Sequence, residues 1–242
     1  MCLCPFLLQV ISFYTWQQHL APAELQAAIN QQLQAAIPTK HPLHSSSSSS
    51  SSGRALPADC QAHVWHVAAA DREFHATFSA HWRRYVYLLP LRQQQQQQQQ
   101  DQHNAQQQQR QLETALQEAD VEPARVDALL QQLQGRRLNY TAYARDTPRG
   151  KGCECTLHVA RASLVRLPAT ASGQGVPCLC IELAGDRFLR RMVRVLVATA
   201  VREALLLQRG HAATGCAGGM DRQATAPPAP ALGLCFAAVG YS

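Results

Sequence analysis

The order of apolar and polar residues predicts a chain in which strands and helices are interspersed. Short runs that alternate in polarity or are rich in β-branched and aromatic residues predict strands, and apolar residues spaced three and four apart predict helices. The predicted strands are Gln9–Thr15, His63–Val67, two pieces within Phe74–Leu89, Thr156–Leu167, Val176–Ala184 and Leu232–Val239. The predicted helices are Pro22–Leu33, Leu112–Leu133 with a break near Pro123 and Gly135 as its C-cap, and Arg187–Leu207.

Two of these elements concentrate cationic and aromatic side chains. On the strand that ends near Leu89, alternation places Arg83, Tyr85 and Tyr87 on one face. On the last helix, four arginines at spacings of three and four are expected to form one stripe: Arg187, Arg190, Arg191 and Arg194. Adjacent cations repel one another, so the stripe requires solvent, carboxylates or phosphate, and the positive end of the helix favours phosphate. A packed strand face and a solvated stripe are the alternatives.

Two low-complexity runs interrupt the pattern. Ser45–Ser52 is an unbroken serine run and Gln93–Gln109 is mostly glutamine, and neither composition buries apolar surface. About 217 residues remain for folding, which suffices for one large or two small domains. We predict an N-terminal half over residues 1–92, a disordered Gln-rich insertion over 93–111, and a C-terminal half over 112–242.

Composition excludes some classes of protein and favours a polyanionic partner. A hydrophobic content of 46% excludes wholesale disorder, and the absence of a long uncharged apolar run predicts no membrane span. The net charge of +6 is uneven, because the segment Arg136–Arg194 holds eleven cationic residues against four acidic ones. Most cationic residues are arginine, which suits bidentate phosphate contacts and base stacking, although genome composition also favours arginine.

Six of the nine cysteines form three Cys-x-Cys pairs. Because residues two apart share a strand face, Cys153 and Cys155 are expected to meet Cys178 and Cys180 across a hairpin. Structural zinc usually requires Cys-x₂₋₄-Cys turns, and the chain has no CxxC, so no metal site is predicted. We therefore interpret these cysteines as small apolar strand residues, and we expect the protein to occupy a reducing, intracellular compartment.

Four blocks, in order along the chain, resemble the TruA-type tRNA pseudouridine synthases. Phe74–Tyr87 is similar to that family's F-H-A-R-F-S-A-x-x-R-x-Y-x-Y block, and Asn139–Tyr143 to its D-F-T-x-F element. Phe188–Arg194 is similar to its F-L-x-x-M-V-R block, and Ala229–Tyr241 to its closing A-P-x-x-G-L-x-L-x-x-V-x-Y strand. The resemblance extends from Gln9 to Tyr241, with the two low-complexity runs as insertions.

The resemblance implies an α+β pseudouridine synthase fold, in which a mixed or antiparallel sheet and flanking helices border a central RNA-binding cleft. It also implies isomerisation of uridine to pseudouridine in the tRNA anticodon stem-loop by a homodimer without cofactor or metal. By resemblance Tyr85 contacts the uracil, Arg194 pairs with a nucleophilic aspartate and Leu234 forms an apolar wall. His75, Arg83 and three members of the stripe are the candidate RNA-binding residues: Arg187, Arg190 and Arg191.

Two departures from the family qualify this expectation. Thr77 stands where the family has an arginine, and no G-R-T-D-A-G-V-H element, which carries the family's catalytic aspartate, is present. We therefore expect an N-terminally truncated member that is inactive as given. Asp186 is expected to cap the last helix or to pair with an arginine rather than to replace the nucleophile.

Two further interpretations stay open. One is a non-catalytic RNA-binding module that binds through the stripe. The other is a polyglutamine-containing interaction or metal-binding protein that uses Cys153, Cys155, Cys178 and Cys180. Neither accounts for the four blocks.

Overall fold

The computed structural model describes residues 9–15, 19–35, 62–91, 121–145, 152–168, 175–211 and 222–241. The chain divides into two compact units, whose main bodies are Ile11–Phe78 and Ser79–Ser242. The boundaries predicted near residues 92 and 112 lie outside the described residues and stay predictions. The serine run and the glutamine run lie outside them too.

The described part of the first unit contains helix α1 (Pro22–Ala35), which confirms the prediction there. Pro22 begins the helix, where a missing backbone N–H costs nothing. None of its residues is buried. Side-chain amides hold it instead: Asn30 binds the backbone N–H of Val64 at 2.7 Å and its carbonyl at 2.9 Å, and Gln26 donates to the carbonyls of Val64 and Trp65.

The strands predicted at Gln9–Thr15 and His63–Val67 are wrong, because none of the residues in these two segments belongs to a strand. The polar groups of Val64 are bound by Asn30 rather than by a neighbouring strand. Phe74–Phe78 is likewise a turn and not a strand piece. There the ring Nδ1 of His75 accepts hydrogen bonds from the backbone N–H groups of Thr77 and Phe78.

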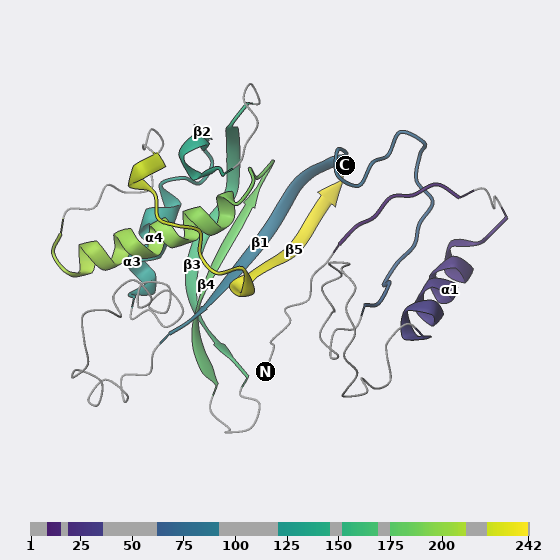
Figure 1. Cartoon of the computed structure of the whole chain (residues 1–242), viewed down its shortest axis with the longest axis horizontal. Helices are drawn as coiled ribbons and strands as arrows, with labels where there is room; N and C mark the ends of the chain where they lie inside the picture. Colours follow the sequence, from purple (N-terminus) through teal and green to yellow (C-terminus); the bar gives the residue numbers. More distant parts are fainter. Residues whose placement is uncertain are drawn as a thin grey trace, which may run out of the picture. The chain divides into compact units, whose positions relative to one another are not determined.

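The second unit is built on a five-stranded antiparallel sheet, so the coarse expectation of an α+β chain is confirmed (Figure 1). Its order is β2-β3-β4-β1-β5, and every pairing is antiparallel. β3 and β4 form the hairpin that the sequence predicted. The strands are β1 (Ala80–Pro90), β2 (Arg137–Asn139), β3 (Glu154–Leu167), β4 (Val176–Gly185) and β5 (Leu234–Tyr241).

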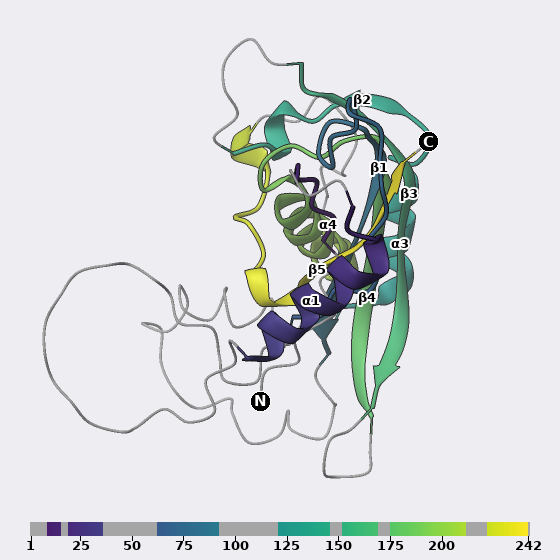
Figure 2. The same ribbon diagram turned by 90° about the vertical axis from the view of Figure 1, so that its right-hand side faces the viewer.

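Helix α4 (Met192–Gln208) lies against one face of the sheet, and Figure 2 shows it end-on beside the strands. Its residues from Val195 to Val201 are all buried, as their apolar character predicted. They pack with Tyr87 and Leu89 of β1 and with the inward residues of β4 in one hydrophobic core. The face of the sheet that carries Tyr85 and Tyr87 is therefore the face that α4 covers.

Helix α3 (Pro123–Gln131) contributes Val126, Leu129 and Leu130 to the same core. Part of the β3 edge is closed by Asp127 of α3 and by Gln134, which follows the helix: Gln134 and Asp127 accept the backbone N–H groups of Ala160 and Ala162 at 3.1 and 2.8 Å. The C-cap of α3 is Gln132, so the expectation of Gly135 as the cap is wrong. Gly135 adopts a φ of 71°, and its N–H binds the carbonyl of Leu157.

Three short 3₁₀ turns join these elements: η3 (Thr141–Tyr143), η4 (Arg222–Ala224) and η5 (Ala231–Gly233). No helix in the described part of the chain is long and apolar enough to cross a membrane.

The last helix begins five residues later than predicted. Arg191 has a φ of 62°, in the left-handed region, and forms the N-cap of α4. A non-glycine residue in this region costs about 1–2 kcal/mol, so the surrounding structure imposes the turn. One such contact is the N–H of Arg145, which binds the carbonyl of Arg190 at 3.0 Å. Arg187, Arg190 and Arg191 therefore precede the helix, and the predicted four-arginine helical stripe does not exist.

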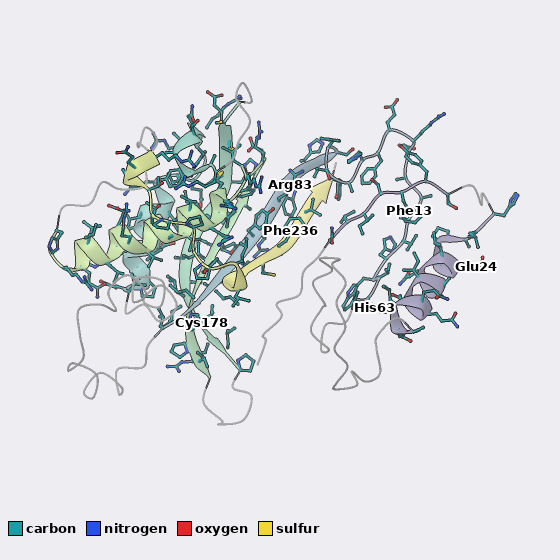
Figure 3. The ribbon with its side chains drawn as sticks, viewed as in Figure 1. Phe13, Glu24, His63, Arg83, Cys178 and Phe236 are labelled. Atoms are coloured by element: carbon teal, nitrogen blue, oxygen red, sulfur yellow. The ribbon has the colours of Figure 1, made fainter. Side chains whose placement is uncertain are left out.

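The two described Cys-x-Cys pairs do not meet across the hairpin. Cys155 lies opposite Leu138 of β2, near the Gly185 end of β4, whereas Cys178 lies opposite Val165. In Figure 3, Cys178 lies toward the end of the sheet that is far from Arg83. The register of β3 on β4 separates the pairs, because Leu157 is opposite Gly185 and Leu167 is opposite Val176.

Candidate functional site

Successive inward side chains of β1 lie beside the chain that runs from the end of β4 into α4. Arg83 donates from Nη1 to the carbonyl of Asp186 at 3.4 Å. Two residues along β1, the ring of Tyr85 meets the ring of Phe188. After two more residues, Tyr87 lies within electrostatic range of Arg194. The face predicted from strand alternation is thus lined by the stretch from Asp186 to Arg194, which holds all four arginines of the predicted stripe and runs from the connecting segment into α4.

Tyr85 lies in an aromatic cluster formed by three elements. Its ring centroid is 5.0 Å from Phe188 in an edge-on arrangement and 5.1 Å from Phe236, its neighbour on β5. Figure 3 shows Phe236 on β5 alongside the part of β1 that carries Arg83. Burial raises the pKa of the Tyr85 phenol and the nearby Arg83 opposes that rise, so the hydroxyl is neutral at physiological pH. Tyr85 therefore offers a fixed, uncharged aromatic surface.

Arg194 and Tyr87 both fasten the turn that precedes β5. Arg194 donates from Nε to the carbonyl of Ala229 at 2.5 Å, while the N–H of Ala229 donates to the carbonyl of Arg194 at 3.0 Å. The Tyr87 hydroxyl donates to the next carbonyl, that of Pro230, at 2.9 Å. Burial raises the pKa of Tyr87 to about 12, against the effect of Arg194. These bonds fix the turn before Leu234, which pairs with Tyr87 in the sheet.

A glycine is required within that turn. A Cβ atom on Gly233 would lie 2.7 Å from both the Leu88 carbonyl oxygen and Cζ of Tyr87. The Tyr87 ring therefore packs directly on the backbone of Gly233. This close packing sets the position of the next residue, Leu234.

The Arg194 guanidinium has unused donors. The side chain is half-buried, and Nε is its one atom that makes a hydrogen bond or ion pair within the described part of the chain. An arginine presents five N–H donors in a planar fork, so the four on its terminal nitrogens remain available. A half-buried guanidinium of this kind can donate two parallel hydrogen bonds to a carboxylate or a phosphate group.

Arg187, Arg190 and Arg191, here called the turn arginines, are exposed on the non-helical segment before α4. They lie on the same connecting segment as Phe188, and Arg194 follows in the first turn of α4. The structure therefore groups them with the Tyr85 site by chain connection, although not by the helical spacing that the sequence predicted.

Asp186 has a structural role that differs from both expectations. Its Oδ1 accepts the backbone N–H of Thr156 at 2.9 Å and that of Arg187 at 2.7 Å. It thus joins the end of β4 to β3 and does not cap α4, whose N-cap is Arg191. Asp186 and burial together raise the pKa of Cys155 to about 11, with burial the larger cause, so that thiol is protonated at neutral pH.

His75 lies in the first unit, where its ring contacts Phe78 at 4.5 Å between centroids. The second unit holds the other candidates: Arg83, Tyr85, Arg187, Arg190, Arg191, Arg194 and Leu234.

Sequence reasoning missed the supporting role of Phe188, Phe236 and Gly233. Tyr87 was placed on the correct face but received no role. The aromatic positions were visible in the blocks, yet their contacts depend on which strands become neighbours. No group of three or more potential metal-ligating His, Cys, Asp or Glu side chains occurs among the residues that the structure describes. No protein-family model matches the chain, and no curated protein sequence matches it.

Proposed function

We propose that the chain is a tRNA-binding member of the TruA-type pseudouridine synthases, with the pseudouridine synthase fold, and that Tyr85, Arg194 and Leu234 form its uridine-binding half-site. The sequence support is the four blocks. The observation that carries the proposal is the half-buried Arg194 guanidinium, held through Nε and with its terminal nitrogens uncommitted. The guanidinium lies near Tyr87, and Tyr87 shares its face of β1 with Tyr85.

The proposed chemistry assigns a separate task to each side chain. Tyr85 stacks on or beside the uracil of a flipped nucleotide, and Leu234 excludes water from it. Arg194 holds a carboxylate ionised by charge pairing, as a nucleophilic aspartate requires. In isomerisation the glycosidic bond breaks, the uracil rotates, a bond forms from C5 to the ribose, and the C5 proton is released.

Residues 1–242 contain no Gly-Arg-Thr-Asp sequence. The chain as given therefore binds tRNA without turning it over. The assay is release of tritium from uracil C5 in labelled tRNA. We expect no release above the rate without protein, and sustained release would contradict the assignment of the aspartate to the missing element.

Binding is tested separately with the turn arginines. Changing Arg187, Arg190 and Arg191 together to Ala should weaken tRNA binding at least tenfold at moderate salt and reduce the salt slope, because each phosphate contact contributes to counterion release. A matched control removes three exposed arginines elsewhere in the second unit: Arg125, Arg136 and Arg209. Equal losses in both triple variants would indicate a net-charge effect and contradict the site. Absence of saturable tRNA binding by the unmodified chain would contradict the family proposal.

A homodimer is part of the same proposal. It is measured by sedimentation of the purified chain with and without tRNA, and a monomer in both conditions would remove that part alone.

A further inference from the structure

The face of the sheet opposite α4 carries an exposed tryptophan in a fixed position. Trp82 of β1 lies opposite Gly240 of β5. A Cβ atom added to Gly240 would lie 2.1 Å from Nε1 and 2.2 Å from Cε2 of Trp82, so the indole rests directly on the glycine backbone. Even so, Trp82 remains 39% exposed. One part of the indole is thus held by backbone contact while another part faces solvent.

Two arginines on the same face share a single carboxylate. Arg84 is two residues beyond Trp82 on β1, and strand alternation places it on the same face. Its Nε is 2.6 Å from Glu182 Oε1, while Arg161 Nη2 is 2.5 Å from Glu182 Oε2. The Arg84 and Arg161 side chains are 43% and 60% exposed, and that of Glu182 only 12%. The cluster keeps one positive charge in excess, and both arginine side chains reach solvent.

These features fit an unpaired nucleotide. Aromatic rings bind bases of any sequence by stacking, and neighbouring arginines bind the phosphates that connect the bases. Packing on Gly240 fixes the indole before any ligand arrives, which lowers the entropic cost of stacking. A second copy of the chain fits less well, because two such faces would bring their surplus positive charges together.

We propose that Trp82, Arg84 and Arg161 form a second RNA-contact surface, which stacks an unpaired base on the face of the sheet opposite Tyr85. This inference rests on the proposed binding of RNA and extends it to a surface that the uridine site does not include. The competing explanation is structural: an aromatic residue that covers a strand glycine also stabilises the sheet.

The experiment uses the full chain with Trp82 as its one tryptophan, made by Trp16→Phe and Trp65→Phe, since the chain has three tryptophans. Trp82 emission is titrated with unstructured oligouridylate while anisotropy of labelled RNA reports total binding in the same samples. We expect emission to be quenched with the same midpoint as the anisotropy change. In the original background, Trp82→Leu should weaken oligouridylate binding about fivefold or more, and Trp82→Phe, which keeps an aromatic plane, should restore most of it.

The outcomes separate this surface from the uridine site. Unchanged Trp82 emission at RNA concentrations that saturate the anisotropy would overturn the proposal and leave the turn-arginine site intact. Quenching that persists when Arg187, Arg190 and Arg191 are changed to Ala would support it independently of that site. Emission that depends on protein concentration and not on RNA would overturn it and assign the face to a second copy. Equal losses in the Leu and Phe variants would also overturn it.

Discussion

Helices α1 and α4 are both predicted by the sequence, yet they are held in place by different forces. α4 is buried along most of its length, from Met192 to Ala204, whereas α1 has no buried residue. The fixed contacts of α1 are amide hydrogen bonds from Gln26 and Asn30 to an extended segment. Hydrophobic burial supplies several kcal/mol per large side chain, while one hydrogen bond supplies about 1 kcal/mol net. The first unit should therefore be the less stable of the two.

The largest effect is expected in the body of α4. Leu196 is fully buried, so Leu196→Ala should destabilise the second unit by about 2–5 kcal/mol. The matched change in α1 is Ile29→Ala, at a half-buried position, and its cost should stay below about 1 kcal/mol. Hydrogen exchange measured by mass spectrometry reports the two helices separately. Similar changes in protection for both variants would break the comparison.

A smaller effect is expected where α1 depends on hydrogen bonds. Asn30→Ala removes both bonds to Val64 and should cost about 1–2 kcal/mol locally, seen as faster exchange of the Val64 amide. Asn30→Asp keeps the acceptor and should preserve part of the protection. Peptides of α4 serve as the internal control, and loss of protection there would show that the two units are coupled.

The last effect concerns the ionisation of Tyr87 and is confined to high pH. Because its pKa in the folded chain is raised to about 12 from an ordinary value near 10, the neutral form is favoured by folding. This contribution is complete below pH 10 and is lost as the pH rises through 12, at no more than about 1.4 kcal/mol per pH unit. Urea unfolding of the second unit between pH 9 and 12 should show a shallower decline for Tyr87→Phe. Parallel declines in the two proteins would contradict a buried, neutral Tyr87.

The sequence predicts regular elements well where local patterning agrees with the final neighbours. Strands 156–167 and 176–184 and the helix from Pro22 were recovered to within two residues or so, because alternation and proline position are local signals. The α4 start was missed because the turn at Arg191 depends on distant contacts, such as the Arg145 N–H on the Arg190 carbonyl. The supposed strand at His63–Val67 failed for a related reason, since Asn30 takes the polar groups that a ladder would use.

The candidate site was predictable in part. The placement of Arg83, Tyr85 and Tyr87 on one strand face follows from alternation alone. Alternation does not predict that Tyr87 and Arg194 bind consecutive carbonyls of the turn before β5. That arrangement requires β5 to pair with β1. The register of β3 on β4, which local pattern does not specify, separates Cys155 from Cys178.

Two side chains that lie along β3, one from α3 and one from just after it, have a consequence for self-association. Unpaired N–H groups at a sheet edge recruit further strands, and glutamine runs such as Gln93–Gln109 are prone to supply them. Asp127 and Gln134 occupy two of these N–H groups, at Ala162 and Ala160. These two side chains therefore block the addition of a further strand at that part of the β3 edge. The part of the edge that they cover is closed to the chain's own glutamine run.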